Sequence, residues 1–433
     1  MGFNHKYLIP GCLDSIVDNL PKLVLSLPRN INLSNFNDII LLYSVSKTDD
    51  AKELEDYKYY PYIVTPQEII FDHCIKYVFY PNDEVKSPNI NATCLRKTYF
   101  SKNFASAESE SNQLPEIDSI FEDEKDIEAF KIGLDKKKEV RVAIANVPLD
   151  EESLINVLRG WPDRSYKRYN RLSKVVNQAI KEKADMLILP EAYVPMEWIP
   201  ALARISANSQ MAIIFGVEHI TNCNGRVFNY TASILPYSKE HEYNFTHIVF
   251  HQKKYFAPGE SECIRGYRAK PECGKSSELI VWNDLWFTTL CCYELASIQD
   301  RSKLFNYIDM LIAIEWNKDV NYFSNIVESL SRDLHCYCVQ VNSSRYGDNR
   351  ITQPAATERK DLIRSRGGIN ESVFIDIVKI DALRHFQEME YHLQKENDRF
   401  KPTPPRFDKN LVSKKIKGTL WEEISKLGVK GKQ

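Results

Sequence analysis

The chain has 433 residues, of which 43% are hydrophobic, 11% aromatic and 27% charged. These values are typical of a globular protein, so they exclude a disordered chain and a fibrous fold. The 57 basic and 59 acidic residues leave a net charge of −2, which gives no overall attraction to nucleic acid or to an anionic membrane.

The sequence shows no sign of membrane insertion or secretion. It lacks a run of apolar residues long enough to span a bilayer, and its first ten residues lack the apolar region of a signal peptide. We therefore expect a cytoplasmic location and no membrane partner. The ten cysteines are then expected to be reduced thiols.

The N-terminal part of the chain divides into two regions. Residues 1–103 mix apolar runs with polar turns, which indicates an additional α/β region of unknown role. Residues 104–138 are predicted to be an acidic linker, because residues 108–128 hold nine acidic residues and one lysine. We expect a solvated linker that ends in a short helix. Docking of a basic macromolecular partner on this N-terminal part is the alternative.

Residues 139–380 alternate apolar runs with helical stretches, which predicts an α/β fold with helices covering a sheet. Apolar spacing predicts helices at 169–183, 199–208 and 322–334. Strands are predicted at 140–145, 186–189, 211–216, 227–235, 245–253, 279–282, 286–291, 310–314 and 337–342.

Residues 381–433 form the C-terminal part, in which the strand pattern stops. One charged amphipathic helix is predicted at 382–400, and the prolines at 402, 404 and 405 end it. Residues 409–433 carry seven lysines and two glutamates, so they form a basic tail. We expect a docked or flexible arm, with a nucleic-acid contact as the weaker alternative.

Three polar residues follow predicted strands directly. Glu191 comes after an apolar strand and a proline, which places a carboxylate at the sheet edge where α/β folds bind ligands. Lys253 ends another strand and could stabilise an oxyanion. Cys292 ends a third, where a sharp turn would expose a nucleophilic sulfur. Alone, each has an ordinary explanation as a cap, a surface lysine or a small buried hydrophobe.

The order and spacing of these residues together resemble the nitrilase (carbon–nitrogen hydrolase) superfamily. Residues 184–191 resemble its glutamate motif, residues 251–260 its lysine motif and residues 291–294 its cysteine motif. Asn229 resembles the asparagine in the strand before the lysine motif. The resemblance covers roughly residues 139–379, a little over half of the chain.

This resemblance implies an αββα four-layer sandwich that forms a homodimer or a higher homo-oligomer. The additional N-terminal α/β region and the C-terminal helical tail would lie outside that sandwich. The implied activity is hydrolysis of a non-peptide carbon–nitrogen bond in a small amide, carbamoyl compound or nitrile, through a cysteine thioester. No cofactor or metal is implied. The alternative is a regulatory nitrilase-like module that binds a protein or nucleic acid.

The resemblance also implies a role for each site residue. Glu191 would be the general base, Lys253 the oxyanion donor, Cys292 the nucleophile and Glu260 the second glutamate, which orients the lysine or binds a substrate amine. The competing residues are Cys291, Lys254 and Glu262.

Aromatic residues beside these motifs are candidates for substrate binding. Tyr193, Tyr293 and Trp316 follow the predicted strand ends, although core packing would explain such aromatics equally well. The loop Glu315-Trp316-Asn317 departs from the Pro/Ser-rich loop common in the family, which leaves the substrate preference open.

Two further patterns carry no function. Residues 269–276 match a loosened phosphate-loop pattern, but a strand follows where a helix is required. His335-Cys336-Tyr337-Cys338 lacks the second pair of ligands that a zinc site needs.

Overall fold

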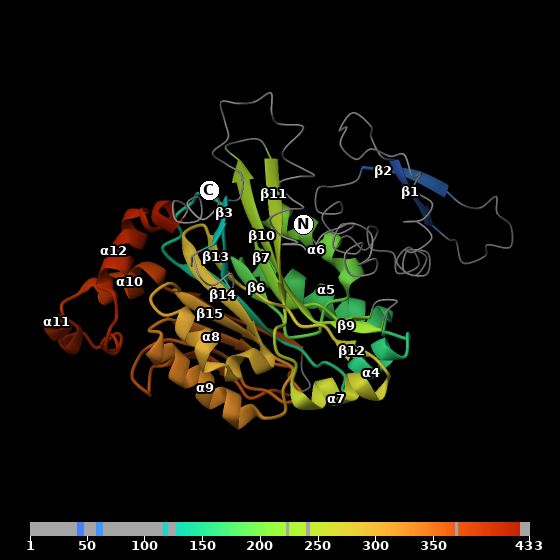
Figure 1. The fold of residues 1–433 in the computed structure, drawn as a ribbon. Coiled ribbons are helices and arrows are strands. Elements are labelled where there is room, and N and C mark those ends of the chain that lie inside the picture. The colour runs from blue at the N-terminus through green and yellow to red at the C-terminus, as the bar shows by residue number, and fades with distance from the viewer. Residues whose placement is uncertain are drawn as a thin grey trace, which may run out of the picture.

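The computed structural model describes residues 41–46, 58–63, 116–119, 127–221, 225–239, 243–368 and 371–424 (Figure 1). The expected role of residues 1–103 therefore lies almost entirely outside the described residues, as does the end of the basic tail. In the N-terminal part, β1 (Leu41–Ser46) and β2 (Lys58–Ile63) pair as antiparallel strands.

A six-stranded mixed sheet carries the first half of the predicted α/β region. Its strand order is β11-β10-β7-β6-β5-β19. The strands are β5 (Val140–Asn146), β6 (Met186–Ile188), β7 (Ala212–Gly216), β10 (Tyr230–Lys239), β11 (Tyr243–Gln252) and β19 (Ser372–Val378). The inner strands β5, β6 and β7 run parallel, whereas β10 and β19 are antiparallel to their neighbours.

An eight-stranded mixed sheet carries the second half, in the order β18-β17-β16-β15-β14-β13-β4-β3. Its strands are β3 (Glu116–Ser119), β4 (Ile127–Ile132), β13 (Ser277–Trp282), β14 (Leu285–Cys291), β15 (Met310–Ile314), β16 (Tyr337–Val341), β17 (Asn349–Thr352) and β18 (Asp361–Ser365). Beside the two large sheets, β8 (Ile220–Thr221), β9 (Arg226–Phe228) and β12 (Lys270–Pro271) form a small sheet.

The helices of the described residues are α4 (Ser153–Leu158), α5 (Tyr166–Lys181), α6 (Ile199–Ser209), α7 (Pro258–Gly266), α8 (Ile298–Lys303), α9 (Val320–Asp333), α10 (Ile380–Glu388), α11 (Tyr391–Glu396) and α12 (Lys409–Lys417), with 3₁₀ turns η5 (Met196–Trp198) and η6 (Cys292–Ala296). Helices α5, α6 and α9 cover the outer faces of the two large sheets, whereas α10 packs against the core between the sheets, and α4 and α7 pack in a small cluster beside β9. In α5, the N-cap Ser165 accepts a hydrogen bond from the amide of Arg168, and one apolar face is buried.

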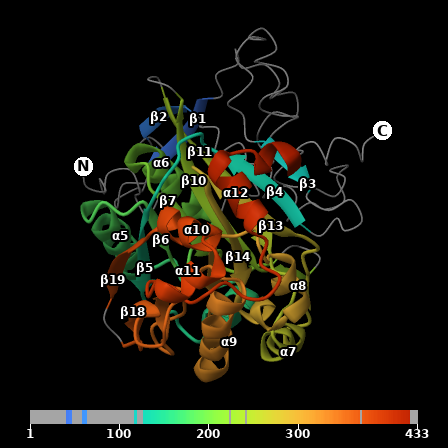
Figure 2. The ribbon, with the colours of Figure 1, turned by 90° about the vertical axis from the view of Figure 1, so that its left-hand side faces the viewer.

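Three large apolar cores and one small cluster around Phe256 lie in the described part of the chain. One lies between the two large sheets, with residues such as Ile144 and Phe287. A second joins the six-stranded sheet to α5 and α6, and a third joins the eight-stranded sheet to α9 and the C-terminal segment (Figure 2). The described chain is thus an α/β structure of two mixed sheets that pack face to face between helices, as the strand and helix alternation predicts. No helix of the described residues is long and apolar enough to cross a membrane.

The end of the predicted linker is a strand, so the short helix expected there is wrong. Residues Ile127–Ile132 form β4, which pairs in parallel with β13 inside the eight-stranded sheet. Ile127, Ala129, Phe130 and Ile132 are buried. The apolar residues of this short segment pack on both faces of the sheet, and that burial outweighs the acidic composition around it.

The C-terminal helix is also different from the prediction. Residues 382–400 do not form one helix, because α10 ends at Glu388 and α11 begins at Tyr391. Part of the basic tail is docked: Leu420, Trp421 and Ile424 belong to the core on the outer face of the eight-stranded sheet. Burial of these apolar residues explains why the lysine-rich composition does not keep the described part of this segment in solvent.

Candidate active site

Glu191 follows β6 and lies at the carboxyl end of the parallel strands. Its side chain is almost fully buried, at 2% exposure for the residue. Oε1 accepts hydrogen bonds from Lys253 Nζ at 2.7 Å and from Asn229 Nδ2 at 2.8 Å, and Oε2 accepts one from the backbone amide of Trp316 at 3.0 Å. Gly216 lies so close that a Cβ atom there would be 2.4 Å from the Glu191 Cα atom, so a larger residue would displace this turn.

Lys253 follows β11 and joins two carboxylates. Its Nζ atom lies 2.7 Å from Glu191 Oε1 and 2.7 Å from Glu260 Oε2. Burial alone would lower the pKa of Lys253, but the Glu191 and Glu260 charges outweigh it and hold that pKa well above its ordinary value. The side chain is therefore an ammonium at neutral pH. The competing Lys254 instead pairs with Asp300, at 2.9 Å.

Glu260 lies in the first turn of α7, where it also caps that helix. Its Oε2 accepts from the amide of Ala257, the helix N-cap, at 3.3 Å. Its Oε1 lies 2.8 Å from His219 Nε2 and 3.0 Å from Asn229 Nδ2. Burial alone would raise the pKa of Glu260, but Lys253 and His219 lower it well below its ordinary value. Glu262, the competing residue, is exposed.

Cys292 begins η6, directly after β14, with a backbone φ of 48°. This left-handed conformation is unfavourable for a residue with a Cβ atom and marks a sharp turn at the strand end. Burial raises the pKa of the Cys292 thiol well above its ordinary value; the Glu191 charge adds to the effect and the Lys253 charge opposes it. The thiol therefore lies within electrostatic reach of both groups.

Cys291, the competing thiol, occupies the last position of β14 and is fully buried, with a φ of −98°. Burial raises the pKa of its thiol as well. The Glu191 and Lys253 charges act on the thiol of Cys291 as they do on that of Cys292. The backbone distinguishes the two residues, because only Cys292 has the left-handed turn.

The sequence analysis did not select three polar residues near this site as candidate site residues. Asn229, noted only as part of a motif, donates to both Glu191 and Glu260. His219 and Glu315 were not selected, although each is a buried polar residue that closely follows an apolar strand. Glu315 accepts from Gln340 Nε2 at 3.1 and 3.0 Å, and burial together with the Glu191 charge raises the pKa of Glu315 to about 8. Glu191 was selected as a polar residue that follows an apolar strand, and the same criterion would have selected His219 and Glu315.

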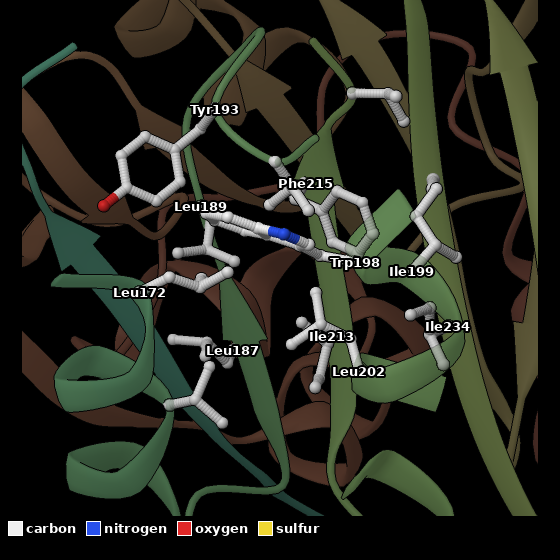
Figure 3. Close-up of a cluster of buried hydrophobic side chains, with 14 of the residues drawn as sticks. Leu172, Leu187, Leu189, Tyr193, Trp198, Ile199, Leu202, Ile213, Phe215 and Ile234 are labelled. Carbon is white, nitrogen blue, oxygen red and sulfur yellow. The ribbon is translucent and has the colours of Figure 1, made fainter. Parts of the chain in front are cut away.

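The three predicted aromatic residues lie in different places. The backbone of Trp316 donates to Glu191, and its half-buried ring packs both against the small apolar cluster around Phe256 and against the core that holds Tyr193. Tyr293 follows Cys292 directly and is 37% exposed. The ring of Tyr193 is buried in the core that also holds Leu172 and Trp198 (Figure 3). The turn at Ala192, with a φ of 53°, precedes the tyrosine and allows the chain to turn away from Glu191.

No cluster of three or more His, Cys, Asp or Glu side chains in the described part of the chain is arranged to hold a metal ion. Lys253 is shared by two carboxylates of the site, those of Glu191 and Glu260. The arrangement offers a base, a cation and a thiol, which are the components of nucleophilic acyl transfer.

No protein-family model matches this sequence, and no curated protein is detectably similar to it. Solved structures of the nitrilase superfamily are similar in fold over about 60% of the chain. XC1258 of Xanthomonas campestris, a CN-hydrolase superfamily protein, is 13% identical with a TM-score of 0.41, over 61% of this chain and 99% of that one. Saccharomyces cerevisiae Nit3 is 14% identical with a TM-score of 0.41, over 58% and 94%. An amidase from Nesterenkonia is 13% identical with a TM-score of 0.40, over 61% and 98%. Likenesses of this size say nothing about the reaction of this chain.

Proposed function

We propose that this protein hydrolyses a carbon–nitrogen bond other than a peptide bond, in a small amide, carbamoyl compound or nitrile, through a thioester on Cys292. One observation carries the proposal: Glu191 and Lys253 follow strands of one sheet and are joined by a 2.7 Å hydrogen bond, and Cys292 forms a left-handed turn at the end of a strand of the other sheet. The likeness of the three sequence motifs to those of the nitrilase superfamily supports the same function.

In the first step, Glu191 removes the proton of Cys292. Because burial keeps the thiol protonated, the sulfur becomes a nucleophile only when a base takes that proton. Glu191 is the strongest charged neighbour of this thiol. Its Oε2 accepts one backbone hydrogen bond from Trp316, and a carboxylate oxygen has capacity for a second hydrogen bond.

The sulfur then attacks the carbonyl carbon of an amide. As the C–S bond forms, the π electrons of the C=O bond move to the oxygen, which becomes an oxyanion. Lys253 and the backbone N–H at the Cys292–Tyr293 turn would stabilise that charge, and one such donor is typically worth ~10²–10³ in rate. Glu191 returns the proton to the departing nitrogen, so the C–N bond breaks and a thioester remains. Water, deprotonated by Glu191, cleaves the thioester and restores the thiol; such acid–base catalysis contributes roughly 10²–10⁴.

Glu260 and the aromatic residues would support this chemistry. Glu260 holds the Lys253 ammonium opposite Glu191, at 2.7 Å. The ring of Phe256 lies 5.5 Å from Lys253 Nζ, which gives the cation an apolar neighbour. We propose that Tyr293 and Trp316 contact the substrate. Tyr193, buried in the core, would contribute to packing instead.

On the strength of the same resemblance, we further propose an αββα enzyme that assembles as a homodimer or a higher homo-oligomer. The cytoplasmic location stays a prediction from the sequence. A macromolecular partner for residues 1–138 stays a prediction, because most of these residues lie outside the described part of the chain.

The proposal is tested with wild type, Cys292→Ala and Cys291→Ala on a panel of amides, ureas and nitriles, with ammonia or amine release as the measurement. We expect turnover of at least one substrate by wild type and by Cys291→Ala, and none by Cys292→Ala. Mass spectrometry should detect an acyl group on Cys292 alone.

Two results would contradict the proposal. Loss of turnover in Cys291→Ala alone would move the nucleophile to Cys291. Absence of turnover on every substrate, together with no labelling of Cys292 by thiol electrophiles, would favour a regulatory module in place of an enzyme.

A further inference from the structure

His251 lies two residues before Lys253, on the face of β11 that meets the other sheet, and is 2% exposed. Its Nδ1 atom is 2.6 Å from Glu278 Oε2, and its Nε2 atom is 2.8 Å from Glu294 Oε2. Both carboxyl groups are buried. Where both carboxyl groups are ionised and accept, the imidazole must donate from both ring nitrogens and is then an imidazolium.

Glu294 connects the two loops that carry the candidate catalytic groups. Its Oε1 accepts from the backbone amide of Lys254 at 2.6 Å, and its Oε2 accepts from the backbone amide of Cys291 at 2.7 Å. Lys254 directly follows Lys253, and Cys291 directly precedes Cys292. One buried carboxylate therefore bonds to the neighbours of both the ammonium and the thiol.

This connection matters because the catalytic groups come from different sheets. Lys253 follows a strand of the six-stranded sheet, whereas Cys292 follows a strand of the eight-stranded sheet. The apolar core between the sheets has no directional preference. The hydrogen bonds of His251 and Glu294 are directional, and charge on both partners makes them stronger than neutral ones.

We propose that His251 is a positioning residue: held between Glu278 and Glu294 as an imidazolium, it fixes the Glu294 carboxylate and thereby the placement of Lys253 relative to Cys292. The kinetic part of this inference rests on the proposed hydrolase function, whereas its structural part does not.

The charges around the ring agree with this role. Burial alone would lower the pKa of His251, but the Glu294 and Glu278 charges raise it to about 10. Burial alone would raise the pKa of Glu294, but His251 and the two backbone amides lower it. Burial raises the pKa of Glu278, against the effects of His251 and Lys254. The ion pair between His251 and Glu294 is therefore complete at neutral pH.

His247 provides a matched control on the same strand. It lies four residues earlier, on the same face of β11, and is also 2% exposed. Its Nε2 atom has no hydrogen-bond partner among the described residues, and burial lowers the pKa of His247 to about 4. Burial in this position does not by itself produce an imidazolium, so the two carboxylates make the difference.

The test compares the full-length chain with His251→Gln and His247→Gln. Glutamine carries no positive charge, and its two N–H donors share one nitrogen, whereas the imidazolium donates from two separate ring nitrogens. With a substrate found in the panel, we expect kcat to fall about 10- to 100-fold in His251→Gln, the loss typical when the partner that orients a site group is removed. We expect KM to stay within about twofold, and His247→Gln to match wild type. Equal kinetics in His251→Gln and wild type, or equal losses in both variants, would overturn the inference.

Two measurements do not depend on turnover. In wild type labelled with ¹⁵N-histidine, both ring nitrogens of His251 should carry protons at pH 7–8, with the signal identified by its absence in His251→Gln. Iodoacetamide should alkylate Cys292 more slowly in His251→Gln than in wild type and His247→Gln. If wild type hydrolyses nothing, these results still decide the role of His251. If His251→Gln does not fold, the wild-type signal is assigned by through-bond correlation with the backbone resonances of residue 251, and a ring with one protonated nitrogen would refute the inference.

Discussion

The two ends of β15 carry buried charges of opposite character. At its start, Asp309 lies in a group that we call the far-end cluster, with Asp284, Arg384 and Lys415. Arg384 bonds to Asp309 at 2.6 Å and to Asp284 at 2.8 Å, and Lys415 Nζ lies 3.4 Å from Asp309. Two acids meet two bases, so the cluster is balanced.

At the other end lies the active-end cluster of Glu191, Lys253 and Glu260, with Glu315 following β15 beside it. Here two carboxylates share one ammonium, and the nearby thiol of Cys292 carries a proton. The excess carboxylate can accept that proton. The comparison teaches that buried charge serves architecture where it is neutralised, and becomes available for chemistry where one negative charge is left over.

Removing the ammonium from each cluster tests this difference most strongly. We expect Lys253→Met to lower kcat by about 10²–10³, since it removes an oxyanion donor and leaves Glu191 and Glu260 without their common cation. Lys415→Met should leave kcat and KM unchanged. Steady-state kinetics of both variants measure the effect. If Lys253→Met and Lys415→Met lower kcat equally, the active-end cluster has no special role in the reaction.

At the far end, the packing of Lys415 should matter more for stability than its charge. Lys415 is 2% exposed and lies over the ring of Trp286, at 5.6 Å from the ring centre. Lys415→Ala should lower the free energy of unfolding by about 3 kcal/mol, because it leaves a cavity. Lys415→Met should stay within ~1 kcal/mol of wild type at pH 7, since Arg384 still pairs with Asp309. Urea unfolding measures both; a Met variant as unstable as the Ala variant would make the lysine charge essential.

The same lysine gives the stability a distinct pH dependence. Burial lowers the pKa of Lys415 to about 8, although Asp309 acts to raise it. Between pH 8 and about 10.5 the unfolded chain binds the proton and the folded chain does not, so this site makes unfolding less favourable as the pH rises. The wild type should gain up to ~3 kcal/mol relative to Lys415→Met across this range. If the difference in the free energy of unfolding between the two proteins does not change with pH, the pKa of Lys415 is not lowered in the folded protein.

The sequence predicts the strands near the site well, because short, fully apolar runs have few alternatives to a buried strand. β6, β14 and β15 lie where apolar runs were found, and polar residues at their ends reach one side of the molecule. The segment of β4 was misassigned, since its acidic neighbours hid the apolar residues that pack between the sheets. Local composition does not reveal which partner strand a segment will meet.

The partners of the candidate site were harder to predict than its central residues. The His251–Glu294 contact joins residues 43 positions apart and depends on the packing of one sheet on the other. Tyr193 shows the same limit, because its position beside Glu191 in the sequence says nothing about the side to which its ring turns. Motif spacing identifies residues, whereas side-chain direction follows from backbone turns such as the one at Ala192.

The smallest expected effect concerns Glu315, which connects the two ends of the comparison through β15. Burial and the Glu191 charge raise the pKa of Glu315 from 4.5 to about 8, so its carboxyl group is mostly neutral at pH 7. Above pH 8 it ionises beside Glu191 and Cys292 and opposes formation of the thiolate. We expect wild-type kcat to fall roughly 3- to 10-fold as the pH rises through 8, for a loss of about 1 kcal/mol. Glu315→Gln, which keeps the shape without the charge, should lack this fall. A pH–rate profile unchanged by the substitution would assign the alkaline limb to another group and leave Glu315 a purely structural partner of Gln340.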